Sequence, residues 1–272
     1  MPTPSTLPAI LSRMRDVDAT LRKIVYHHIL AELPSPLVLT ISQREQICQN
    51  GLGDRDPTVR AAAGKVIGGW VESVGGLESV RTSPIGMYAS LSCQILAFQF
   101  LKMLDVTTSK VAEDVLFSVF VTRPDIFEAV EFPSSFWSEL SPERAFLARG
   151  FVDHCKSIKV RLFVGASLGF VIEISKDDTS LENALPVVTA LAFQIQHEYN
   201  ALTILMGPDA GIDDEEELEL ARGDGEFVVA ELLKLAVNLD YADETGRRKM
   251  FALVRKLPSI SDVTSCMSSS NR

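Results

Sequence analysis

Cysteine and long apolar runs are both scarce in this chain of 272 residues. Its four cysteines, Cys48, Cys93, Cys155 and Cys266, lie far apart and include no CxxC pair. This spacing favours neither a disulfide framework nor a zinc knuckle. No apolar run reaches the roughly 18 to 20 residues that span a bilayer, and the first 15 residues place their basic side chains after their apolar ones, unlike a secretory signal. We therefore expect reduced thiols and a protein of the cytosol or nucleus, without a membrane partner.

Basic residues are also scarcer than acidic ones. The chain has 26 lysines and arginines against 36 aspartates and glutamates, a formal net charge of −10. Such a surface repels phosphates at long range, so any contact with nucleic acid is expected to be a local basic patch. Apolar residues make up 46% of the chain and charged residues 23%, which is the balance of a folded globular protein.

One pattern resembles a catalytic motif. Residues 165–169 read GASLG, a GxSxG sequence centred on Ser167, and they follow the strand-like segment VRLFV as a nucleophile elbow would. An elbow needs a parallel sheet beneath it and a later aspartate and histidine, but the only downstream histidine, His197, lies in a helical pattern. A hydrolase acting through Ser167 is therefore the remote alternative, and we predict a protein that is not an enzyme.

Metal and phosphate motifs are missing as well. His27 and His28 are adjacent, so on a helix they point in different directions and do not form the i, i+4 pair of a metal site. His154 and Cys155 have no further ligand at metal spacing, and no Gly-rich phosphate loop with lysine and serine or threonine is present. We expect no cofactor and no small-molecule substrate.

A short motif occurs twice, 38 residues apart. Its shared positions are two aspartates, a threonine, an aliphatic residue and an arginine: Asp16, Asp18, Thr20, Leu21 and Arg22, then Asp54, Asp56, Thr58, Val59 and Arg60. Asp18 and Asp56 can each accept a backbone N–H of the first helical turn, so each copy predicts a turn followed by a helix. Arg22 and Arg60 are expected to pair with neighbouring aspartates along a ladder of repeats. A weaker third copy occupies residues 243–247.

Each of the first two copies follows another helical pattern, and later segments continue the apolar spacing of three and four residues. Neither member of a helix pair can bury its apolar face alone, so neighbouring pairs must stack. We predict an all-α HEAT-repeat superhelical solenoid of about six helix pairs across residues 1–257. Its core is expected to contain Leu21, Val25, Val59, Ile67, Leu116, Phe146, Val188, Leu191 and Leu232.

Two segments are predicted to lie outside the helices. Residues 208–225 are acidic and rich in turn-forming residues, which indicates a solvated loop, or alternatively an acidic dock for a basic segment. Residues 258–272 are polar and rich in serine, and we expect them to form a disordered tail.

Several blocks, read in order, resemble condensin complex subunit 3, the CAP-G family. They are RDVDATLRKIVYHHIL, LTISQREQICQNGLGDRDPTVRAAAGKVIGGWV, VAEDVLFSVFVTRPDIF, ERAFLARGFVDHC, LPVVTALAFQIQHEYN and LLKLAVNLDYADETGRRKMFALVR. The resemblance implies a HEAT-repeat subunit that binds the condensin kleisin and, with it, double-stranded DNA in mitotic chromosome condensation. ATP hydrolysis belongs to the SMC subunits, which the kleisin joins. The location implied is the nucleus and its chromosomes, or the cytoplasm outside mitosis.

The resemblance covers most of residues 7–256, and it reaches only a central run of the family's repeats. Residues 80–94 and 160–175 depart from the family pattern, and both begin Val-Arg. Because the codons of Val-Arg can read like the start of an intron, we interpret the two segments as possible non-native insertions from a mis-spliced gene model.

For DNA, the expected contacts are basic residues on the second helices of the pairs: Lys23, Lys65, Arg248 and Lys249. The motif residues Asp18, Arg22, Asp56 and Arg60 are expected to be mainly structural. Kleisin binding is expected to use exposed apolar side chains instead. The alternative function is a generic HEAT-repeat adaptor that binds protein without contacting DNA.

Overall fold

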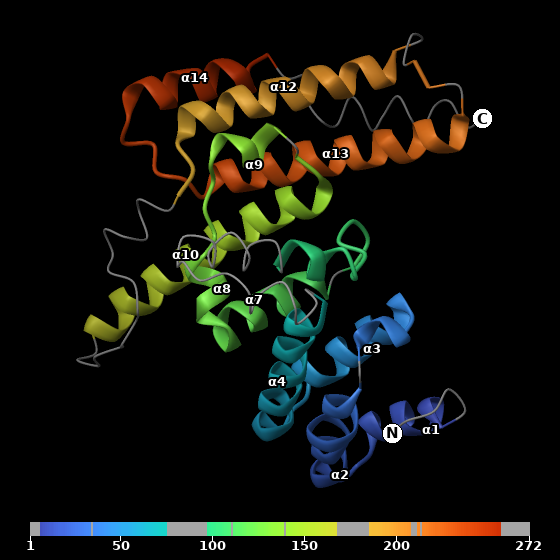
Figure 1. Cartoon of the computed structure of the whole chain (residues 1–272). Coiled ribbons are helices and arrows are strands. Elements are labelled where there is room, and N and C mark those ends of the chain that lie inside the picture. The colour runs from blue at the N-terminus through green and yellow to red at the C-terminus, as the bar shows by residue number, and fades with distance from the viewer. Residues whose placement is uncertain are drawn as a thin grey trace, which may run out of the picture.

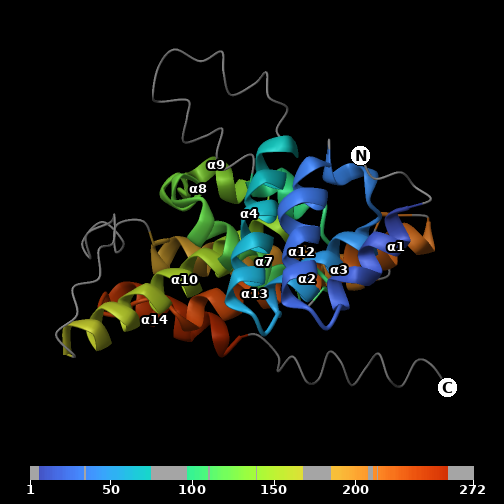
Figure 2. The same cartoon turned by 90° about the horizontal axis from the view of Figure 1, so that it is seen from below.

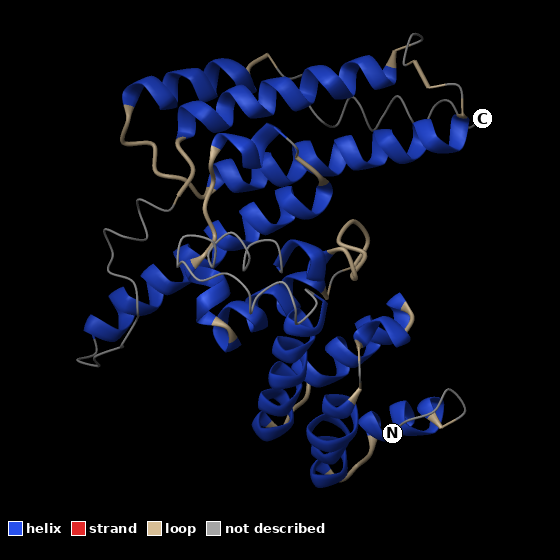
Figure 3. Cartoon of the chain, in the orientation of Figure 1, coloured by secondary structure: helices blue, strands red, loops and turns tan. Residues whose placement is uncertain are grey.

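The computed structural model describes residues 6–33, 35–74, 97–109, 111–138, 140–167, 185–207, 211–212 and 214–256. Within these ranges the chain forms helices and connecting loops, without a strand (Figure 3). The suspected insertion at residues 80–94, the second half of the other one, and the expected tail at 258–272 lie outside the described residues. The number of helix pairs also depends on them. None of the described helices has the length and apolarity needed to cross a bilayer.

The N-terminal helices lie at one end of the molecule and the C-terminal helices at the other (Figure 1). Figure 2 views the chain from below, so that the first helices lie in front of later ones. The first part consists of short and longer helices: α1 (Leu7–Ser12), η1 (Arg13–Arg15), α2 (Ala19–Ile24), η2 (Val25–Ile29), η3 (Leu30–Glu32), η4 (Pro36–Val38), α3 (Ile41–Leu52) and α4 (Pro57–Val74). The second part contains α7 (Ala112–Thr122), α8 (Pro124–Glu128), α9 (Ser134–Ser138), α10 (Pro142–Ser167), α12 (Val188–Met206), α13 (Glu215–Val237) and α14 (Glu244–Val254).

Neighbouring helices pack against one another, as in a stack of pairs. Helix α4 contacts α2, α3 and α7, and α7 contacts α10. Helix α10 in turn packs on α13, and α12 packs on both α13 and α14. Because each helix buries its apolar face against the next ones, a continuous core runs along the chain. The architecture is the predicted all-α HEAT-repeat solenoid.

Eight of the nine core residues predicted from the sequence are buried: Val25, Val59, Ile67, Leu116, Phe146, Val188, Leu191 and Leu232. Leu21 is the exception, with 42% of its surface exposed. The buried face of α2 and η2 is instead formed by Arg22, Val25 and Tyr26. Tyr26 donates its hydroxyl hydrogen to the carbonyl of Ile47 in α3 at 3.0 Å, and this bond helps to set the rotation of the helix that turns Leu21 outward.

The acidic segment is a helix over most of its length, which corrects the prediction of a loop at 208–225. Helix α13 begins at Glu215, and the side chain of Asp214 caps it by accepting the N–H of Glu216 at 3.0 Å. Three glutamates occupy its first turn, where the positive end of the helix dipole favours negative charge. The same charges that suggested a solvated loop therefore stabilise a helix start.

The strand-like reading of VRLFV is also wrong. These residues belong to α10, which begins at Pro142 and ends at Ser167. A nucleophile elbow needs a strand before its serine, but the residues that precede Ser167 are helical. Pro186 is buried just before α12, which begins at Val188.

Candidate binding surface

The two copies of the sequence motif have the same local structure. Asp18 accepts the N–H of Thr20 at 2.8 Å, and Asp56 accepts the N–H of Thr58 at the same distance. In each copy a carboxylate oxygen satisfies a backbone N–H donor that the first turn of the helix leaves without a partner. Asp243 caps α14 in the same way, through the N–H of Thr245 and Gly246. All three copies are therefore helix starts.

The motif arginines also occupy equivalent positions. Arg22 donates through one guanidinium nitrogen to the carbonyl oxygens of Asp16 and Val17, at 2.8 and 3.1 Å. Arg60 donates to the carbonyl oxygens of Asp54 and Arg55, at 2.7 and 3.1 Å. Each arginine thus closes the turn that precedes its own helix.

Arg22 additionally joins two repeats. Its guanidinium donates two hydrogen bonds to the carboxylate of Asp54, at 2.7 and 2.9 Å, and both side chains are almost fully buried. These hydrogen bonds lower the pKa of Asp54 and raise that of Arg22. The expected ladder contact is therefore confirmed for Arg22. Arg60 differs, because its side chain is exposed and bonds to backbone carbonyls of its own turn.

Replacing Asp54 by asparagine is expected to lower the urea concentration at the unfolding midpoint at pH 7. The pKa of Asp54 is lower in the folded chain than in the unfolded one, so its ion pair contributes fully above the unfolded pKa and is lost as pH falls through the folded pKa. The difference between Asp54→Asn and the parent chain should therefore shrink in acid. Urea titrations at pH 7 and below the ordinary pKa of aspartate, about 3.9, measure it. Asp114→Asn, at an exposed position of α7, is the control, and an undiminished difference in acid contradicts the prediction.

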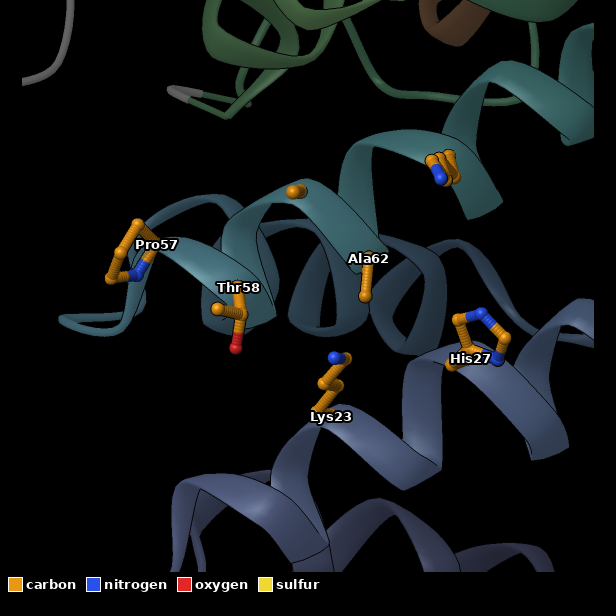
Figure 4. A pocket seen from close by; sticks show the side chains of 7 residues that line it. Lys23, His27, Pro57, Thr58 and Ala62 are labelled. Carbon is orange, nitrogen blue, oxygen red and sulfur yellow. The ribbon is translucent and has the colours of Figure 1, made fainter.

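Two of the four expected DNA contacts lie in one groove. Lys23 and His27 come from α2 and η2, and Lys65 comes from the neighbouring α4; with Pro57, Thr58, Ala61 and Ala62 they line a cavity of about 350 Å³ (Figure 4). Both lysines and the histidine are exposed at this groove. The arrangement follows from helical spacing, because Lys23 and His27 are four residues apart and share one face.

The other two expected contacts lie on α14, toward the opposite end of the chain (Figure 1). Arg248 forms an ion pair with Glu244, four residues before it. Lys249 places its ammonium group 4.5 Å from the centre of the exposed Phe193 ring of α12. Both side chains remain solvent-accessible, so the structure brings Lys23 and Lys65 together and keeps this second pair apart from them.

A buried polar cluster connects three helices of the second part. Arg149 of α10 donates to Glu231 of α13, to Asp153 at 2.7 Å and to Glu113 of α7 at 3.1 Å. Burial alone lowers the pKa of Arg149, but the hydrogen bond and charge of Glu231 outweigh this, and the pKa is raised. Glu231 is 1% exposed and also accepts a hydrogen bond from Lys234. The cluster is therefore a charged contact inside the solenoid, rather than on its surface.

The residues considered for metal or nucleophilic chemistry are dispersed or buried. His27 and His28 stack edge to face, with ring centroids 4.6 Å apart. Cys48 and Cys155 are both buried, and burial raises the pKa of the Cys48 thiol to about 12. His154 is buried among Phe117, Phe120 and Phe127. In the part of the chain that the structure describes, no three histidine, cysteine or acidic side chains are grouped as metal ligands.

Sequence reasoning missed three polar residues that the fold uses. His27 could have been added to the basic groove from its spacing to Lys23. Arg44 is buried and donates to the carbonyls of Leu39 and Met103, both at 3.0 Å. The sequence offers only the i, i+4 spacing of Arg149 to Asp153, because its partner Glu231 lies 82 residues further along the chain. Only the tertiary contacts reveal the roles of Arg44 and Arg149.

No protein-family model matches the sequence. Individual curated proteins, however, are similar to it in sequence. The chain is 31% identical over 248 residues to condensin complex subunit 3 of Schizosaccharomyces pombe, and 26% identical over 263 residues to that of Saccharomyces cerevisiae. These alignments cover 90% and 96% of the chain but 22% of each relative. The chain therefore spans about a fifth of the length of the relatives it matches.

The fold has a solved counterpart. The crystal structure of the S. pombe condensin Cnd3–Cnd2 subcomplex superposes with a TM-score of 0.69 and 29% sequence identity. The match covers 93% of this chain and 27% of the solved one. Sequence and fold therefore agree on the same relatives, and the resemblance noted from the ordered sequence blocks is confirmed.

Proposed function

We infer that this chain, a segment related to condensin complex subunit 3, acts as a non-catalytic HEAT-repeat scaffold that binds the condensin kleisin and, with it, double-stranded DNA. The observation that carries the inference is the match of almost the whole chain to a condensin subunit solved in complex with Cnd2. Through the kleisin the scaffold joins the SMC ATPase subunits. It acts on chromosomes in the nucleus during mitotic condensation, and outside mitosis it can also be cytoplasmic.

The fold supports a role in binding rather than in chemistry. A solenoid exposes a long surface for its size, and its repeats can hold an extended partner along many helices. The serine of the catalysis-like motif, Ser167, is the last residue of a helix rather than a residue that follows a strand. The polar clusters around Asp54 and Arg149 instead hold neighbouring helices together.

DNA contact is proposed at two separate places. Lys23 and Lys65 line the groove between α2 and α4, and Arg248 and Lys249 lie on the exposed side of α14. Each can neutralise a phosphate. Because the chain carries a net charge of −10, these contacts are expected to be weak on their own. A kleisin that adds basic charge or encloses the duplex should raise the affinity for DNA.

Capture of a kleisin is the experiment that tests the proposal. A tagged condensin kleisin, co-expressed with the full-length subunit that contains this chain, should retain the subunit through a wash in high salt, because apolar contacts are not screened. The matched control combines Lys23→Glu, Lys65→Glu, Arg248→Glu and Lys249→Glu, and it should be captured equally well. If no kleisin is captured, or if the complex binds no DNA even at low salt, the generic adaptor that binds only protein becomes the better reading.

A further inference from the structure

We propose that the groove between α2 and α4 binds an acidic peptide segment of a partner protein, with a carboxylate held by Lys23 and Lys65 and an apolar side chain against Pro57, Ala61 and Ala62. This proposal goes beyond the kleisin and DNA contacts inferred above and does not depend on them. It rests on the composition, size and position of the groove.

The charge of the groove is opposite to that of the chain. The chain as a whole is acidic, yet the two formally charged side chains that line the groove are both lysines. His27, at the same groove, adds a ring N–H donor. An acidic ligand is therefore attracted to this place and repelled from most of the remaining surface, which gives selectivity as well as affinity.

The floor of the groove is apolar. Pro57, Ala61 and Ala62 of α4 add small aliphatic surfaces to the lining, and Figure 4 shows Lys23 extending from its helix toward α4, near Thr58 and Ala62. The hydroxyl of Thr58 donates to Asp56 at 2.8 Å, so toward a ligand its oxygen acts as an acceptor. A peptide can use all of these features, since it combines N–H donors, carboxylates and aliphatic side chains.

The size of the groove favours a peptide over a duplex. A cavity of about 350 Å³ holds one or two side chains, and burying an aliphatic side chain there removes apolar surface from water. Duplex DNA is stiff and wide, so its phosphates can reach the lysines at the rim, but its backbone gains nothing from an apolar floor. A substitution that fills the apolar floor should therefore weaken the binding of a peptide and leave the binding of a DNA duplex unchanged.

Fluorescence anisotropy with the full chain tests the proposal. The probe is a fluorescein-labelled peptide of twelve residues with two leucines flanked by aspartates and glutamates; its partner probe carries asparagine and glutamine instead. We expect the acidic probe to bind, and Lys23→Glu with Lys65→Glu to weaken it by about tenfold or more. Ala61→Trp, at an exposed position, fills the floor, keeps both lysines and should weaken the acidic probe by about fivefold or more.

Controls separate the groove from general electrostatics. Lys102→Glu with Lys156→Glu changes the net charge equally at exposed positions away from the groove and should leave peptide binding within about twofold. A labelled DNA duplex should be little affected by Ala61→Trp. The proposal is overturned if the neutral probe binds equally well, if Ala61→Trp leaves the acidic probe unchanged, or if Ala61→Trp weakens only the duplex. Circular dichroism of each variant verifies that the helices are retained.

Discussion

Replacing Arg149 by methionine is expected to lower the free energy of unfolding by about 3–5 kcal/mol. The guanidinium is buried and joins α10 to α7 and α13 through Glu113 and Glu231. Methionine fills a similar volume but leaves Glu231, which is 1% exposed, with Lys234 as its remaining charged partner. A buried carboxylate that loses most of its compensation is far more costly than a lost surface ion pair. Urea unfolding, monitored by circular dichroism, measures the change.

Two further variants isolate the charge effect. Arg55→Met removes an exposed arginine with a single long hydrogen bond to a carbonyl oxygen, so it should change stability by less than about 0.5 kcal/mol. Arg149→Met combined with Glu231→Leu removes both buried charges and should be more stable than Arg149→Met alone. A single Arg149→Met variant as stable as the parent chain contradicts the prediction.

Reversing Lys23, Lys65, Arg248 and Lys249 to glutamate together should almost abolish binding of the kleisin-bound scaffold to DNA. Each lost phosphate contact lowers the slope of log K against log salt by about 0.9, so the four together should flatten it by about 3 to 4. At low salt this corresponds to a loss of at least about two orders of magnitude in affinity. Titrations of a labelled duplex at several salt concentrations measure both quantities.

The same assay measures separately the contribution of each of the two pairs of basic residues to DNA binding. Lys23→Glu with Lys65→Glu should lower the slope more than Arg248→Glu with Lys249→Glu, because Arg248 and Lys249 already interact with Glu244 and Phe193. Lys102→Glu with Lys156→Glu is the charge-matched control and should leave the slope nearly unchanged. If the control lowers the salt slope as much as Lys23→Glu with Lys65→Glu does, net charge rather than the proposed contacts governs binding.

Local interactions explain why the helix starts were predictable. Asp18, Asp56 and Asp243 each cap a helix through N–H groups two or three residues away. A capping bond of this kind depends on neighbours in the chain, so it is visible in eight residues of sequence. The same reasoning failed for residues 215–225, where glutamates at a helix N-terminus were read as a loop.

The sequence by itself determined the class of fold, the capped helix starts, eight of the nine predicted core positions and the family that the chain resembles, because these depend on local bonding, helical spacing and the order of blocks. Only the tertiary structure decided which face of a helix is buried and which distant residues meet. Leu21 is exposed because α2 is oriented by contacts with α3 and the Asp54 turn. Lys23 meets Lys65, and Arg149 meets Glu231, since packing joins helices whose separation in the chain hides their proximity.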